Sequence, residues 1–205
     1  MAKLRLTKGE LKRQRDSLKQ FQHYLPTLQL KKQQIQIEVQ RVRAKLSEQL
    51  NKINSTKQKI EEWAGLLTEQ PVDFRNWVKP KQIRVKTINI ASVDIPVFDG
   101  VVFGEIEYDL FFTPLWVDVA VERIKNLIAL IEEEQVTKTQ ERLLREELRI
   151  TTQRVNLLEK VKIPESIENI RQIRIYLGDQ QTNAVGRCKL AKNKIAQAVA
   201  EGVMA

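Results

Sequence analysis

Few side chains in this sequence could carry out chemistry. The 205 residues contain one histidine, His23, and one cysteine, Cys188. A structural zinc site needs about four ligands, mostly Cys and His, and a nucleophilic triad needs a histidine held beside its nucleophile. His23 instead falls within a long helical pattern, beside its apolar positions, and Cys188 falls on an apolar helical stripe. We therefore interpret both as structural residues and expect no metal site.

Nucleotide chemistry and acid–base chemistry are not indicated either. Gly100 and Gly104 are not followed by Gly-Lys-Ser/Thr, so the sequence lacks the phosphate-binding loop of many nucleotide hydrolases. The run Glu132-Glu133-Glu134 is typical of a solvated helix face. We expect a protein that is not an enzyme by itself and that uses no cofactor.

Positive charge at both ends of the chain is the strongest chemical signal. The chain has 35 Lys and Arg against 26 Asp and Glu, a net charge of +9. Residues 1–60 hold 15 basic and 4 acidic side chains, and residues 181–205 hold 4 and 1. Residues 61–110 hold 5 and 9. Basic ends with a mildly acidic middle indicate a partner that is acidic or polar.

The first long segment predicts a coiled-coil helix. Thr7-Lys8-Gly9-Glu10 has the form of a capping box, and a heptad pattern then begins at Leu11. Thirteen of its seventeen a and d positions are apolar. Pro26 interrupts this helix because it lacks an N–H and crowds the carbonyl of Gln22. The apolar seam consists of Leu11, Leu18, Phe21, Leu25, Leu28, Ile35, Val39, Val42, Leu46, Ile53, Ile60, Trp63 and Leu67.

The segment from Pro71 to Pro114 has a different character. Its prolines and glycines separate short apolar runs, and most of the aromatic residues of the chain lie in or beside it. Ile83 and Val85 alternate with Arg84 and Lys86, and a second β-prone run follows Asp99-Gly100 and reaches Leu110. The pattern predicts a small head that contains a β-hairpin.

Helical periodicity returns at Leu115. Pro164 interrupts this second helix as Pro26 interrupts the first, and beyond about residue 180 we expect a mainly single-helix tip. The apolar stripe consists of Val117, Val121, Ile124, Ile128, Ile131, Leu144, Leu148, Val155, Leu158, Ile167, Ile170, Leu177, Ala184, Cys188, Ala191, Ile195 and Ala198.

The order helix, head, helix predicts an all-α fold, a long antiparallel two-helix coiled coil with a small β-hairpin-containing head in the middle of the sequence. We divide it into residues 1–70, 71–114 and 115–205, and treat the three as one structural unit. If Leu67 faces Arg123, Pro26 lies level with Pro164. Charged residues interrupt the most apolar stretch, from Leu110 to Ile131, so no membrane span is expected. Together with the lack of a secretory signal, this predicts a soluble cytoplasmic protein.

Three functions remain open on these grounds. The chain could be a scaffolding rod whose ends dock into other proteins, a basic arm that binds nucleic acid, or a helical-hairpin chaperone. The second function lacks aromatic stacking platforms near the charge. The third lacks apolar side chains off the seam at its tips.

Short sequences spread along nearly the whole chain resemble the D-subunit family of V/A-type ATP synthases. The matching residues are Leu6-Thr7-Lys8, Leu11, Arg13, Leu18 and Leu25, Leu28-Gln29-Leu30-Lys31-Lys32, Asn89-Ile90-Ala91, Val93, Ile95-Pro96, Arg154-Val155-Asn156, Leu158-Glu159, Ile163-Pro164, Arg187, Lys189-Leu190 and Lys192. They occur in the family's order.

The resemblance implies a rotor axle in the central stalk. The paired termini would enter the catalytic hexamer of A and B subunits, and the other end would join the F subunit of the stalk and the coupling subunit on the membrane ion-carrying ring. The complex would be peripheral to the membrane on its cytoplasmic side, with no nucleic acid and no direct membrane insertion. Trp77, Phe98 and Phe103 are candidates for contact with stalk subunits. The hexamer would be met by Lys8, Lys12, Arg13, Arg187, Lys189, Lys192 and Lys194.

Overall fold

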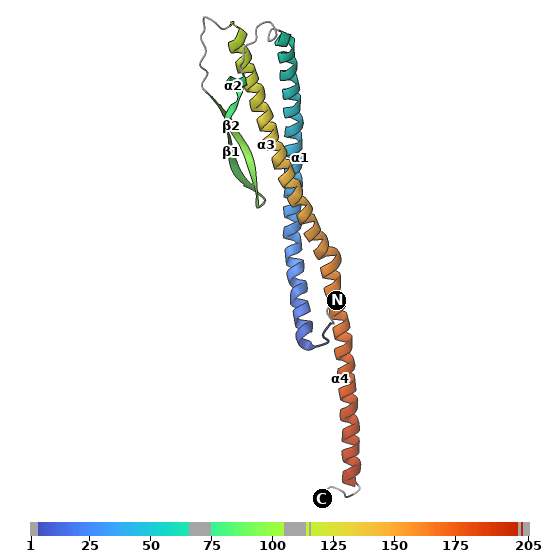
Figure 1. Cartoon of the computed structure of the whole chain (residues 1–205). Coiled ribbons are helices and arrows are strands. Elements are labelled where there is room, and N and C mark those ends of the chain that lie inside the picture. The colour runs from blue at the N-terminus through green and yellow to red at the C-terminus, as the bar shows by residue number, and fades with distance from the viewer. Residues whose placement is uncertain (1–3, 66–74, 105–113, 115, 201, 203–205) are drawn as a thin grey trace. The chain divides into compact units, whose positions relative to one another are not determined.

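The computed structural model describes residues 4–65, 75–104, 114, 116–200 and 202 (Figure 1). Its elements are α1 (Lys8–Ala64), α2 (Arg75–Val78), β1 (Pro80–Ile90), β2 (Val93–Phe103), α3 (Trp116–Leu157), a π-helical turn (Leu158–Lys162) and α4 (Ile163–Ala200). The predicted fold class is confirmed: long helices stand at both ends of the sequence and a two-stranded antiparallel hairpin lies between them. The chain divides into an end unit, Met1–Gln29 with Gln153–Ala205, and a middle unit, Leu30–Thr152.

Helix α1 begins where the sequence predicts. The backbone N–H of Glu10 donates to Oγ1 of Thr7 over 3.3 Å, which satisfies one of the free donors of the first turn. The Glu10 carboxylate accepts a bond from the side chain of Gln14 at 2.8 Å. Pro26 lies inside the helix, which continues to Ala64.

The heptad pattern of α1 is confirmed by burial. Ile35, Val39, Val42 and Ile53 are buried. The other predicted seam residues from Leu11 to Trp63 are all half-buried, and Leu67 lies outside the described residues. One side of the helix is therefore covered along its length, as a coiled-coil seam requires.

In the middle unit, α1 packs beside α3, and the hairpin covers the pair. Ile35, Val39 and Val42 of α1 form the core with Leu144 of α3 and Ile95 of β2. Ile90, Ala91 and Val93 at the hairpin tip pack against this cluster, together with Leu46 and Leu148. The small head of the sequence prediction is thus anchored on the long helices by its tip.

Ion pairs between α1 and α3 show the register of the two helices. Lys45 Nζ lies 2.9 Å from Glu133 Oε1, and Lys31 Nζ lies 3.0 Å from Glu147 Oε1. The predicted register, with Leu67 facing Arg123, would have placed Lys45 near Arg145 instead, so it was wrong by several turns. In the end unit, Phe21 lines one groove together with Lys162 and Glu165, which flank Pro164 in the sequence.

The hairpin turn differs from the sequence expectation. The strands turn at Ala91 and Ser92, whose φ angles are 51° and 63°, as a two-residue turn of type I′ requires. Asp99-Gly100 lies inside β2, where an extra residue shifts the register opposite Arg84 and Val85. The glycine there has a φ of 150°, a conformation that side chains disfavour. The hairpin was predicted, but its second strand begins at Val93 rather than after Asp99-Gly100.

The apolar stripe of α3 and α4 is confirmed as far as Leu177, with one exception. Val117, Val121, Leu144, Val155 and Ile170 are buried. Ile167, which was predicted on the stripe, is 51% exposed, and Ile173 is fully buried in its place. The π-helical turn at Leu158–Lys162 adds a residue to the helical repeat and rotates the positions that follow it.

Beyond Leu177 every residue from Gly178 to Gln197 is exposed. The expected single-helix tip is therefore present, and Ala184, Cys188, Ala191 and Ile195 of the predicted stripe face no described residue. None of the described helices has a stretch long and apolar enough to cross a bilayer.

Candidate partner-binding surfaces

The exposed end of α4 carries four of the predicted partner-binding cations. Arg187, Lys189, Lys192 and Lys194 are all exposed, and none forms an ion pair with any residue in the described part of the chain. Their charges are fully available, and Val185, Leu190 and Val199 expose apolar surface on the same stretch of α4. Such a helix can offer a partner both charge and apolar contact.

The three predicted cations of α1 lie on two different faces of the end unit. Lys8 and Lys12 border a groove between α1 and α4, whereas Arg13 borders a second groove on the other side of the same helices. Arg13 also lies 3.9 Å from Glu10. The prediction had grouped the three together, and the structure separates them.

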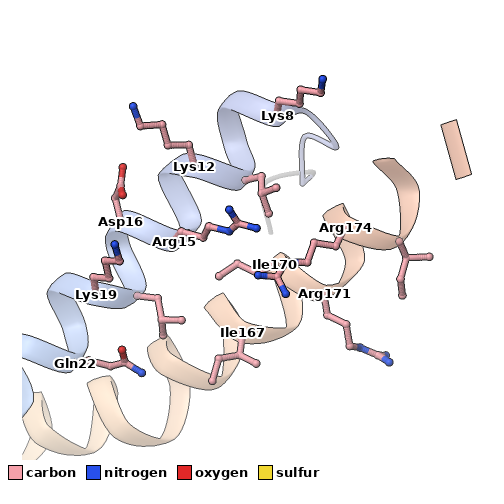
Figure 2. A pocket seen from close by; sticks show the side chains of 13 residues that line it. Lys8, Lys12, Arg15, Asp16, Lys19, Gln22, Ile167, Ile170, Arg171 and Arg174 are labelled. Atoms are coloured by element: carbon pink, nitrogen blue, oxygen red, sulfur yellow. The ribbon is translucent and has the colours of Figure 1, made fainter. Parts of the chain in front are cut away.

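The first groove, which we call the basic groove, contains cations that the sequence analysis did not single out. Arg15 and Lys19 of α1 and Arg171 and Arg174 of α4 join Lys8 and Lys12 around it (Figure 2). The signal lay in the spacing, because Lys8, Lys12, Arg15 and Lys19 recur every three or four residues on one helix face. Their partners on α4 could be found only once the register was known.

Apolar side chains form the rest of the basic groove. Leu11 and Leu18 of α1 and Ile170 of α4 belong to the seam, while Ile167 and Ile175 of α4 are 51% and 54% exposed. The groove therefore combines an apolar surface with a strongly positive border. Among the described residues, Asp16 is the one acidic residue that lines it.

One cation of the groove is already neutralised. The guanidinium of Arg171 donates to both carboxylate oxygens of Glu168, at 3.0 and 3.2 Å. This hydrogen bond, with a further one from Gln172, lowers the pKa of Glu168, and the same carboxylate raises the pKa of Arg171. Both groups stay charged at neutral pH, so the pair adds no net charge to the groove.

The predicted stalk-contacting aromatics are half-buried. Phe103 in β2 lies under Lys125 of α3, with Nζ 5.3 Å from the ring centroid. Trp77 in α2 and Phe98 in β2 keep part of their surface exposed. Strand β1 exposes Ile83, Val85 and Ile88 at 39–47%.

Residues that could carry catalysis are dispersed. His23 makes an edge contact with Tyr24 at 5.8 Å between ring centroids, and Cys188 is exposed rather than on a packed seam. Among the residues that the structure describes, no group of three or more His, Cys, Asp or Glu side chains could hold a metal ion.

Comparison with known proteins identifies the family. Residues 10–193 match the family model for the D subunit of ATP synthase. The chain is 46% identical over 195 residues to the V-type ATP synthase D subunit of Borreliella burgdorferi, covering 95% of this chain and 96% of the relative. It is 32% identical over 198 residues to the V-type ATP synthase D subunit of Chlamydia caviae, covering 96% and 95%. The chain therefore belongs to the ATP synthase D-subunit family.

Proposed function

We propose that this chain is the central-stalk axle of a rotary V/A-type ATP synthase and transmits torque between the catalytic hexamer and the membrane ion-carrying ring. Membership of the D-subunit family supports a place in the ATPase complex. Two features together carry the proposal. Helix α1 has a continuous apolar seam, and the end of α4 is exposed and cationic. The chain itself is non-catalytic, and the nucleotide sites belong to the A and B subunits.

The paired helices suit a member that resists twisting. Interdigitating side chains pack as densely as an organic crystal, so two helices joined along a seam deform less than one helix alone. The ion pairs of Lys31 with Glu147 and of Lys45 with Glu133 join the two helices outside the seam. A rotation imposed at one end of such a helix pair would reach its other end with little loss of angle to twisting.

Asymmetry links rotation to the state of each catalytic site. A two-helix shaft inside a ring of three equivalent sites meets each site with a different face. When the shaft rotates by a third of a turn, the contacts that it makes with each catalytic site change. The equilibrium of that site between open and closed forms then shifts by the difference in contact energy. The cations Lys8, Lys12, Arg13, Arg187, Lys189, Lys192 and Lys194 would meet acidic or polar groups of the hexamer.

The head would contact the stalk and coupling subunits rather than the hexamer. Trp77, Phe98 and Phe103, with the exposed apolar side chains of β1, offer partly apolar surface to the F subunit of the stalk or to the coupling subunit of the ring. The complex would be peripheral to the membrane on its cytoplasmic side.

Reconstitution tests the axle. Replacing Lys189, Lys192 and Lys194 by Gln should weaken assembly with the A and B subunits, most strongly at low salt, and should uncouple ion transport from ATP hydrolysis. Replacing Lys57, Lys59 and Arg149, which are exposed elsewhere, removes the same charge and is the matched control. Hydrolysis by the hexamer alone should persist. Equal assembly and coupling in both variants at every salt concentration would refute the proposal.

A further inference from the structure

The two grooves of the end unit differ in charge. The groove beside Arg13 is lined by two acidic residues, Glu10 and Glu165, and by two basic ones, Arg13 and Lys162. The basic groove is lined by six cations and, of the acidic residues that the structure describes, by Asp16 alone. Both grooves lie along the same pair of helices, so the imbalance is a property of one face and not of the general basicity of the chain.

Five of the six cations have no carboxylate partner within the part of the chain that the structure describes. They are Lys8, Lys12, Arg15, Lys19 and Arg174. Figure 2 shows that Arg15 and Arg174 extend into the groove from opposite helices, while Lys8 and Lys12 extend outward from α1. Facing guanidinium groups repel one another, and an anionic group placed between them would remove the repulsion.

The groove contains more apolar side chains than the packing of the seam requires. Ser166, Ile170 and Ile173 are the buried positions of this part of α4. Ile167 and Ile175, eight residues apart on one face, remain half exposed beside them. Two large apolar side chains at that spacing match the contact face of another helix.

We propose that the basic groove binds an acidic amphipathic helix of a partner and so becomes a local three-helix bundle. Apolar side chains of the partner helix would pack on Ile167 and Ile175, and its flanking carboxylates would pair with Arg15, Arg174 and Lys12. The groove runs from Lys8 to Gln22 on α1, about 21 Å at 1.5 Å per residue, which matches a helix of roughly four turns. A nucleic acid fits less well, because no aromatic side chain in the described part of the chain lines the groove for stacking.

The inference rests on the proposed function in one respect: such a helix would belong to a protein that surrounds the paired chain ends. A binding experiment on the isolated full chain tests it separately. The probe is a fluorescent 18-residue peptide of Leu and Glu, with Leu at heptad a and d positions. A peptide of the same composition in scrambled order is its control. Anisotropy gives the affinity for each chain variant.

Paired variants locate the binding. Ile167→Gln with Ile175→Gln should weaken the peptide at least tenfold, and so should Arg15→Gln with Arg174→Gln. Ile37→Gln with Leu50→Gln and Arg142→Gln with Arg149→Gln change exposed residues of the same chemical classes outside the groove and should leave affinity within twofold. All four side-chain pairs are exposed, and circular dichroism confirms that each variant keeps its helices.

The outcomes separate the possibilities. No binding, equal binding of the scrambled peptide, or equal losses from groove and control variants would overturn the inference. Random 30-nucleotide RNA that displaces the peptide and binds the Ile167→Gln, Ile175→Gln variant as tightly as the unaltered chain would assign the groove to nucleic acid instead. If peptide binding fails while Lys189, Lys192 and Lys194 variants uncouple the ATPase, the groove inference falls and the axle stands. If the peptide binds in the groove while the Lys189, Lys192 and Lys194 variants stay coupled, the groove inference stands and the axle proposal falls.

Discussion

The side-chain amide of Gln140 in α3 donates a hydrogen bond to the main-chain carbonyl of Pro96 in β2. Gln140 is 6% exposed, so this bond is shielded from water. The bond joins the hairpin to the helix next to the apolar core, where Ile95 packs with Leu144. A buried carbonyl that loses its donor keeps the full cost of its desolvation.

Gln140→Met removes the donor and keeps nearly the same length and volume. The free energy of unfolding should fall by about 1–3 kcal/mol, since the partly buried Pro96 carbonyl would lose its partner. Hydrogen exchange of the hairpin amides near Val93 should quicken. Gln135→Met on the exposed face of α3 is the control and should change stability little. Similar behaviour of the two variants would show that the bond does not hold the hairpin.

The hairpin turn holds two non-glycine residues in the left-handed region, Ala91 at 51° and Ser92 at 63°. This conformation costs an L-residue about 1–2 kcal/mol, and glycine avoids most of the cost. Ser92 is exposed, whereas Ala91 packs on the core, so only Ser92 can change without disturbing a contact.

Ser92→Gly should therefore raise the free energy of unfolding by about 0.5–1 kcal/mol, after the larger entropy of glycine in the unfolded chain is subtracted. Urea unfolding followed by circular dichroism measures it. Thr87→Gly in exposed β1, where the backbone is extended, should lower stability instead. A destabilised Ser92→Gly protein would show that the turn carries no strain.

The sequence could locate the hairpin but not its turn. A turn of type I′ usually has Asn-Gly or Asp-Gly, and Asp99-Gly100 offered that signal while Ala91-Ser92 did not. The core explains the difference, because Ile90, Ala91 and Val93 pack against α1 and α3 only if the chain reverses between them. Tertiary packing decided the register, and a local signal cannot report it.

The same limit applies to the candidate surfaces. The heptad on α1 and the exposed cations of α4 follow from spacing and composition, and both could be predicted. The basic groove required the register of α1 against α4, which no single helix specifies. Arg15 and Arg174 face one another only because of that register.

Glu141 gives the stability a dependence on pH. A hydrogen bond from Arg43, at 2.9 Å, is the main cause that lowers the pKa of Glu141 below its ordinary value, and the charge of Arg145 adds to it. Because the folded-state pKa is lowered, the pair stabilises the fold above the unfolded-state pKa. That contribution is lost as the pH falls through the lowered value.

Glu141→Gln should thus be less stable than the unaltered chain at pH 7 by at most about 1 kcal/mol, since Arg43 is half exposed. The difference should shrink between pH 5 and pH 3. Urea midpoints across that range measure it, with Glu146→Gln, at an exposed site, as the control. A constant difference down to pH 3 would exclude this linkage.

The π-helical turn at Leu158–Lys162 shifts the apolar stripe by one residue relative to a continued heptad. Within the turn, the N–H of Ile163 donates to the carbonyl of Leu158, five residues earlier. Heptad positions continued from Leu144, Leu148, Thr151 and Val155 would fall on Glu165, Asn169, Gln172 and Tyr176. The more buried positions are one residue later, at Ser166, Ile170, Ile173 and Leu177. The turn therefore takes up one residue and keeps the stripe in position.

Deleting exposed Glu159 should convert the turn into regular α-helix and leave the later stripe where it is. Pro164→Ala is included in this variant, because the ring would otherwise crowd the carbonyl four residues before it. The free energy of unfolding should stay within about 1 kcal/mol of the Pro164→Ala protein. Deleting exposed Glu146, in a regular stretch of α3, should cost more than about 3 kcal/mol, because it rotates several buried side chains out of the core. Equal losses from the two deletions would mean that the turn does not absorb the extra residue.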